Sequence, residues 1–249
     1  MAGRAYSTEA VVLRSIRFGE ADRVLHLYTA ARGRVGAVAK GVRKTMSRFG
    51  ARLEPLSHVE LMLHEGSGEL QTVTGADLVR SHRGAREDGY RLQVGLIGAE
   101  AMLRLFVEPE PNRRAFTALA RFLDTLDGLP APAPGAGGRP ALDALALAFQ
   151  LKLLWVSGYL PHLTSCVECG VGALVGFSPR AGGAVCREHA PGALALSAET
   201  FAAAERLLSA PLADAPGIEL SDRARRETLV VVTSSYEEHG GFRLRTLSA

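Results

Sequence analysis

The sequence predicts an α+β fold, because its first third alternates with the period of β-strands and most of the rest repeats with the period of helices. A second observation is that all three cysteines lie between positions 166 and 186. We therefore expect a β-domain at 1–80, an α-helical domain at 81–160 and 193–249, and a small cysteine-bearing module at 161–192 inserted into the helical domain.

Five short apolar or alternating segments predict the strands, at 8–16, 23–29, 35–39, 59–64 and 70–74. The segment Glu65-Gly66-Ser67-Gly68 separates the last two and is typical of a hairpin turn. Five short strands in so little sequence suit a small closed barrel, of which the OB-fold is one form. The stretch 41–52 shows little hydrophobic periodicity and predicts a mobile basic loop between the third and fourth strands.

Five segments with apolar residues three or four apart predict helices, at 90–106, 116–126, 142–155, 198–208 and 222–239. The Pro/Gly/Ala-rich stretch 128–140 predicts a linker. The segment 142–155 is apolar nearly all round, which indicates a central core helix, but it is too short for a bilayer. With no signal-peptide pattern at the N-terminus, we expect a soluble cytoplasmic protein without a membrane span.

Positive charge is concentrated at the start of the chain. Residues 1–52 hold eleven Lys and Arg against three acidic residues, a net charge of +8, so the remainder of this +3 chain carries −5. A basic domain of this kind indicates a polyanionic partner such as nucleic acid, although a solvated basic face without a partner would look the same. The expected contact residues are Arg34, Lys40, Arg43, Lys44, Arg48 and Arg52.

The cysteines and one histidine form a C-x2-C-x16-C-x2-H pattern made of Cys166, Cys169, Cys186 and His189. Two knuckles with two-residue spacers bring four ligands to one tetrahedral ion, and thiolate with imidazole favours zinc. Because four protein ligands leave no open position for water, we expect a structural Zn²⁺. His162 and Glu168 are alternative fourth ligands, and burial of single cysteines as apolar residues is the competing interpretation.

Motifs for phosphate loops, dinucleotide binding, metalloproteases and serine hydrolases are absent from the sequence. Glu20 and Asp22 form a close carboxylate pair, which is the only candidate for a metal-dependent nuclease, but a turn into the second strand explains them equally simply. We therefore expect no catalytic site and no enzymatic activity.

Several blocks of the sequence together resemble the RecO family. They are Gly19-Glu-Ala-Asp-Arg23, Ala39-Lys-Gly-Val-Arg43, Ser47-Arg-Phe49, Leu53-Glu-Pro55, Phe149-Gln-Leu-Lys-Leu-Leu154, Gly158-Tyr-Leu-Pro161 and Phe177-Ser-Pro179. Thr29, Gly33, Gly182 and Gly183 also match, and Gly170 follows the first knuckle as in that family. One departure is His189, because zinc-bearing members usually end the motif with a fourth cysteine.

The resemblance implies an N-terminal OB-fold, a helical domain and an inserted zinc module. It also implies binding of single- and double-stranded DNA, annealing of complementary strands, and loading of the recombinase RecA with RecR and RecF onto DNA coated by the single-strand-binding protein SSB. It further implies contact with the acidic, Phe-ended tail of SSB. We expect that contact in residues 90–160 and 193–239, where Arg121, Lys152 and Arg206 are candidate cations.

Two other function classes stay open from the sequence. A zinc-ribbon RNA-binding or transcriptional module would share the charge and the metal pattern, and a nuclease would use Glu20 and Asp22. Phe18, Tyr28 and Phe49 are candidates either for stacking on bases or for the barrel core.

Overall fold

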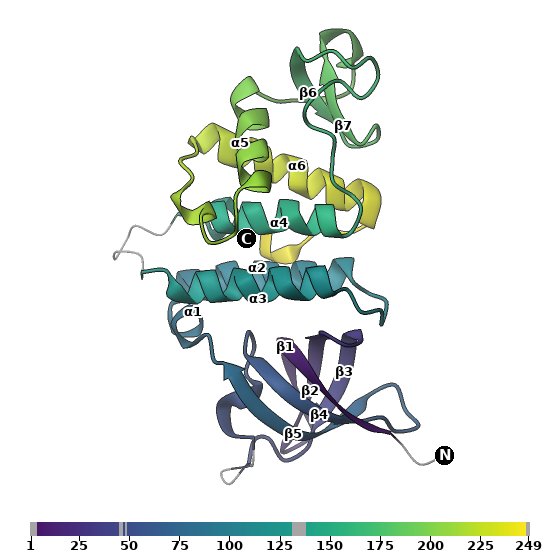
Figure 1. Ribbon diagram of the computed structural model, residues 1–249, viewed down its shortest axis with the longest axis vertical. Helices are drawn as coiled ribbons and strands as arrows, with labels where there is room; N and C mark the ends of the chain where they lie inside the picture. Colours follow the sequence, from purple (N-terminus) through teal and green to yellow (C-terminus); the bar gives the residue numbers. More distant parts are fainter. Residues whose placement is uncertain (1–3, 45–46, 48, 131–137, 248–249) are drawn as a thin grey trace. The chain divides into compact units, whose positions relative to one another are not determined.

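The computed structural model describes residues 4–44, 47, 49–130 and 138–247 (Figure 1). The chain divides into two compact units, Met1–Leu129 and Pro130–Ala249. The first unit therefore contains helices as well as the barrel. The division into a domain at 1–80, a two-part helical domain and a module at 161–192 stays a prediction.

A closed five-stranded barrel forms the first part of the N-terminal unit (Figure 1). Its strands are β1 (Ala5–Phe18), β2 (Asp22–Thr29), β3 (Gly33–Ala39), β4 (His58–His64) and β5 (Gln71–Arg80). The order around the barrel is β1-β2-β3-β5-β4, with β1 closing onto β4 and β3 pairing in parallel with β5. This is the topology of an OB-fold, so the predicted fold class is confirmed. β5 runs farther than the predicted 70–74.

Residues 40–57 cross from β3 to β4, which are not neighbours in the barrel. The sequence predicts a mobile basic loop here, but part of the described segment is built into the barrel. Phe49 and Leu53 are each only 1% exposed and pack into the barrel core. Phe49 precedes the short 3-10 helix η1 (Gly50–Leu53), and Leu53 is its last residue. The connection therefore caps one end of the barrel with its apolar side chains.

Three helices follow the barrel in the same unit: α1 (Arg83–Glu87), α2 (Gly89–Leu105) and α3 (Arg113–Gly128). The predicted helices at 90–106 and 116–126 correspond to α2 and α3, whereas α1 was not predicted. His82 is 2% exposed and ties this part together, because its Nδ1 lies 2.7 Å from the carbonyl oxygen of Leu56 and its Nε2 lies 3.1 Å from Asp124 Oδ1 of α3. The turn between α2 and α3 packs onto the start of β3, where Phe106 contacts Tyr28 edge-on.

The C-terminal unit is built around α4 (Ala144–Val156), with α5 (Ala198–Ser209) and α6 (Asp222–Gly240) packed against it (Figure 1). As predicted, α4 is buried nearly all round, and even its Gln150 is 1% exposed. Gln150 Oε1 accepts a 2.5 Å hydrogen bond from the hydroxyl of Tyr236 on α6, which satisfies a polar group in the core. The 3-10 turns η2 (Pro140–Leu142), η4 (Ala215–Gly217) and η5 (Arg245–Leu247) complete this unit.

Between α4 and α5 the chain forms a small sheet of order β7-β6-β8, made of β6 (Leu174–Ser178), β7 (Gly183–Cys186) and β8 (Leu194–Ala195). The short helix η3 (Arg187–His189) follows β7 directly. Buried side chains in this module are few: its core cluster consists of Cys166, Val185 and Cys186. Within the described residues, no helix combines the length and apolar character that crossing a bilayer requires.

Gly33 gives a direct test of how the barrel meets the α2–α3 turn. Its φ is +64°, and an added Cβ would lie 2.1 Å from the carbonyl oxygen of Glu110. Gly33→Ala is therefore expected to lower the free energy of unfolding by more than about 1 kcal/mol, measured by urea denaturation. Gly19→Ala is the matched control, because Gly19 has a φ of +55° and open space around it. Equal losses for both variants would contradict the close approach.

Candidate metal centre and nucleic-acid interface

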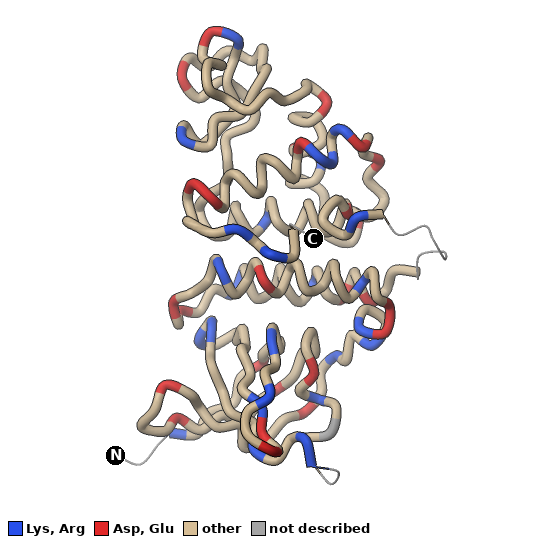
Figure 2. The backbone as a smooth tube through the Cα atoms, turned by 180° about the vertical axis from the view of Figure 1, so that it is seen from behind, with Lys and Arg blue, Asp and Glu red and all other residues tan. Residues whose placement is uncertain are grey.

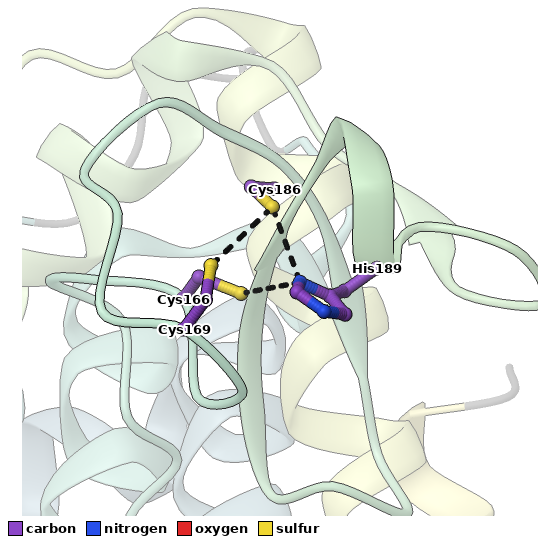
Figure 3. A group of neighbouring side chains, drawn as sticks. All are labelled: Cys166, Cys169, Cys186 and His189. Atoms are coloured by element: carbon purple, nitrogen blue, oxygen red, sulfur yellow. Dashed lines mark hydrogen bonds between the residues drawn. The ribbon is translucent and has the colours of Figure 1, made fainter.

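Three consecutive local structures bring the knuckle residues together (Figure 3). The first knuckle is a tight turn, in which the Gly170 N–H donates to the Cys166 carbonyl at 2.8 Å and Gly170 has a φ of +77°. Its Val167 N–H donates to the Ala184 carbonyl of β7 at 3.0 Å, which holds the turn beside the second knuckle. Cys186 ends β7, and His189 ends η3.

The four ligand atoms have the spacing of a tetrahedron. They all lie within 4.8 Å of one another, with 3.7 Å between the Cys169 and Cys186 sulfurs. His189 Nδ1 lies 3.6 Å from Cys166 Sγ and 3.4 Å from Cys186 Sγ. Metal–sulfur and metal–nitrogen bonds of usual zinc length place tetrahedral ligands about 3.8 Å apart for S–S and about 3.6 Å apart for S–N. The cluster therefore fits one tetrahedral metal ion.

The surroundings favour the metal-binding thiolate form at Cys166 and Cys186. At Cys169, a hydrogen bond from the Val171 backbone lowers the pKa, but burial and side-chain hydrogen bonds with the other two cysteines outweigh it and raise the pKa. Burial alone raises the pKa of Cys166, but hydrogen bonds from the backbone at Cys186, Glu168 and Cys169 outweigh it and bring the pKa to about 6. The pKa of Cys186 is also lowered, chiefly by hydrogen bonds from the backbone and side chain of His189. The alternative ligand His162 is outside the cluster, and its Nε2 lies 2.7 Å from Ser165 Oγ.

The predicted contact cations fall into two groups on the barrel. Lys40, Arg43 and Lys44 are exposed at the end of β3. Figure 2 shows basic segments on several strands and on the chain beside the grey break that follows β3.

The second group is half-buried. Arg34 belongs to it, and its guanidinium lies 3.5 Å from the Leu103 carbonyl of α2. Arg52 is half-buried at the capping segment, and Arg48 lies outside the described residues.

Pairing in the barrel adds two residues that sequence inspection missed. Arg14 of β1 is directly opposite His26 of β2, and Leu25 and Leu27 point inward, so His26 and Arg14 share the outer face with Arg34. Partial burial, and then the positive charges of Arg34 and Arg14, lower the pKa of His26. Arg14 and Arg34 thus bring two positive charges to this face, while the lowered pKa favours the neutral form of His26 between them, and only the strand register reveals the grouping.

Of the carboxylate pair considered for a nuclease, Asp22 uses its carboxylate in a structural contact, and Glu20 takes part through its backbone carbonyl. Asp22 Oδ1 accepts a 2.7 Å hydrogen bond from the Gly41 N–H, and the Glu20 carbonyl accepts one from the Arg43 guanidinium at 3.0 Å. These contacts join the β1–β2 turn to the chain leaving β3. Of the candidate aromatic residues, Tyr28 and Phe49 are buried and Phe18 is 55% exposed.

Comparison with known proteins agrees with these features over the whole chain. The family model "Recombination protein O N terminal" matches residues 1–82, and "Recombination protein O C terminal" matches residues 86–248. A "DNA repair protein RecO" of Rubrobacter xylanophilus is 40% identical, covering 89% of this chain and 88% of the relative. The protein of that name from Frankia casuarinae is 41% identical over 97% of this chain and 96% of its own.

The chain belongs to the RecO family of DNA repair proteins. A relative from Anaeromyxobacter sp. strain K, also named "DNA repair protein RecO", is 36% identical over 94% of this chain and 91% of its own length. The RecO match covers the barrel, the helices and the cysteine module together. The matches therefore favour the RecO family over the alternative of a zinc-ribbon RNA-binding or transcriptional module.

The metal cluster can be tested at the position where this chain has a histidine. His189→Cys is expected to keep about one metal ion per chain, because a thiolate also completes a tetrahedral set, whereas His189→Ala loses most of it. The measurement is elemental analysis of freshly purified protein. His162→Ala is the control and should keep its metal. Full metal content in His189→Ala would show that the imidazole is not a ligand.

Proposed function

We propose that this protein binds single- and double-stranded DNA through its barrel and anneals complementary strands. We further propose that it helps RecR and RecF to load RecA onto DNA coated by SSB, in the cytoplasm at the nucleoid. The observation that carries the proposal is the group of exposed cations at the end of β3, Lys40, Arg43 and Lys44, on a barrel of OB topology. Membership of the RecO family supports the same conclusion.

The chemistry required for annealing is charge neutralisation. Two DNA strands repel each other through their phosphates, and cations that contact both strands lower this repulsion. Duplex formation is then favourable without any covalent step, so the proposal includes no catalytic residue and no nucleotide cofactor. Arg14 and Arg34, on the outer face of the barrel, extend the positive surface onto the strands themselves, and the neutral His26 beside them can donate a hydrogen bond.

The metal is proposed to be a structural Zn²⁺ held by Cys166, Cys169, Cys186 and His189. Bound there, the ion would supply cross-links between the two knuckles of a module whose buried cluster is small. Two features support a structural role for this ion. Its ligands lie far along the chain from the barrel that is proposed to bind DNA, and the four protein ligands leave no open position for a substrate or water.

The DNA site can be tested by charge reversal on exposed side chains. Arg43→Glu with Lys44→Glu is expected to weaken binding of single-stranded DNA and to flatten the log–log salt dependence by about 0.7 per lost phosphate contact. Fluorescence anisotropy across a salt series measures both effects. Arg180→Glu with Arg226→Glu carries the same charge change on exposed residues of the other unit and serves as the control. Unchanged affinity at moderate salt in the first variant would exclude this segment as the site.

A second proposed contact is with the acidic, Phe-ended tail of SSB. A cavity of about 460 Å³ lies beside the C-terminal end of α4, and its lining includes Trp155, Leu163 and Leu208. Trp155 is 55% exposed. Lys152 lies next to this cavity, because its Nζ donates to the Leu208 carbonyl at 2.6 Å. An apolar cavity with an adjacent ammonium group suits an aromatic ring beside a terminal carboxylate.

Trp155→Ala is expected to weaken binding of a synthetic SSB tail peptide at least tenfold, since it removes a wall of the cavity. Val230→Ala on α6 is the control, because Val230 is also exposed, at 40%, and is not part of the cavity. Isothermal titration calorimetry gives both affinities. If the two variants bind the peptide equally well, the tail binds elsewhere.

A further inference from the structure

A second pocket lies in the N-terminal unit, where the capping segment meets the end of β5 and α1. Its volume is about 420 Å³. The capping segment contributes one wall and the exit of β5 with α1 contributes the other. The lining residues are Ser47, Phe49, Ala51, Arg52, Leu78, Ser81 and Arg86.

The lining is positively charged and contains no acidic side chain. It combines two arginines, Arg52 and Arg86, with two serines, Ser47 and Ser81, whose side chains carry guanidinium and hydroxyl groups. Every one of these groups can donate hydrogen bonds to an anion. The apolar remainder includes Leu78, which is 46% exposed and gives the pocket a nonpolar wall.

Arg86 differs from the basic residues near it in the chain. Arg80 lies 3.7 Å from Asp124, and Arg83 lies 2.7 Å from Glu87. Within the described residues, Arg86 forms no ion pair with an acidic side chain, and its Nε atom is buried without a hydrogen-bond partner. Because the Nε atom is covered, a ligand in the pocket would meet the terminal N–H groups of this guanidinium, whose charge no carboxylate offsets.

Phosphate esters suit this combination of groups. A guanidinium donates two parallel hydrogen bonds to phosphate oxygens, and hydroxyl groups can satisfy the remaining ones. The volume exceeds that of a phosphate ion alone and leaves room for the attached sugar against Leu78. We propose that this pocket holds one backbone phosphate of a bound DNA strand, with Arg86 and Arg52 as its ligands.

The inference rests on the proposed DNA binding and extends it. Arg86 lies outside the residues 1–82 matched by the N-terminal family model and outside the cations predicted from the sequence. In this proposal, Arg86 provides a phosphate contact on α1. A DNA strand held by the cations at the end of β3 would then continue over the capping segment to this helix.

The test compares two arginines of the same short helix. Arg86→Gln and Arg86→Ala are expected to weaken binding of an oligothymidylate severalfold and to reduce its log–log salt slope by about 0.7, the value for one phosphate contact on a single strand. Arg83→Ala is the control, because Arg83 is exposed and paired with Glu87. Circular dichroism and thermal unfolding check that each variant is folded. If both Arg86 variants are folded and bind like the wild type, the pocket does not hold a strand phosphate.

A second measurement identifies the source of the phosphate. The Arg86 Nε–Hε signal in nitrogen-edited NMR, assigned by its loss in Arg86→Gln, is expected to shift when oligothymidylate is added. A shift with inorganic phosphate or a mononucleotide but not with the oligonucleotide would indicate an adventitious ion only and would overturn the proposal. Absence of DNA binding by the wild type would instead refute the proposed function itself, which separates the two failures.

Discussion

Closure of the barrel by parallel pairing of β3 with β5 is the constraint on which the N-terminal unit depends. Because β5 lies between β3 and β4, the chain leaving β3 must cross the barrel end to reach β4. An apolar cap is therefore required there, and Phe49 and Leu53 provide it. The basic side chains of the same segment cannot enter that core, so the crossing displays them at the surface.

This arrangement explains why a cluster of like charges is tolerated. Phe49 and Leu53 anchor the crossing, while the exposed cations preceding them can be used for binding without disturbing the core. Like charges still repel each other and weaken the fold, and a polyanion bound across them would relieve that repulsion. In the other unit, four ligand atoms lie within 4.8 Å of one another beside a small buried cluster, and an ion bound there would cross-link the two knuckles.

Sequence reasoning predicted the regular elements well because their patterns are local. Helices were expected at 198–208 and 222–239, and α5 and α6 cover Ala198–Ser209 and Asp222–Gly240. The knuckle spacing was equally informative, since two-residue spacers constrain geometry directly. Features that depend on distant pairing were missed. His26 is placed between Arg14 and Arg34 only through its register with β1, and α1 is too short to show a period.

The same reason explains what the sequence leaves open at the capping segment and at Arg86. Phe49 and Leu53 are single apolar residues within a basic stretch. The sequence leaves Phe49 as a candidate for base stacking or for the core, and only the fold places both residues in the barrel. Arg86 resembles Arg83 in sequence, yet Arg83 is paired with Glu87 whereas the Nε of Arg86 is a buried donor without a partner. Distinguishing the two requires the folded chain.

The central claim is that this protein of the RecO family brings complementary DNA strands together by neutralising their charge. The most direct measurement is the rate at which two complementary oligonucleotides, each first coated with SSB, form a duplex in a fluorescence-quenching assay without ATP. The account predicts that the protein accelerates duplex formation and that the acceleration declines steeply as salt is raised. A rate equal to that of the SSB-coated strands alone, at every protein concentration and at low salt, would contradict it.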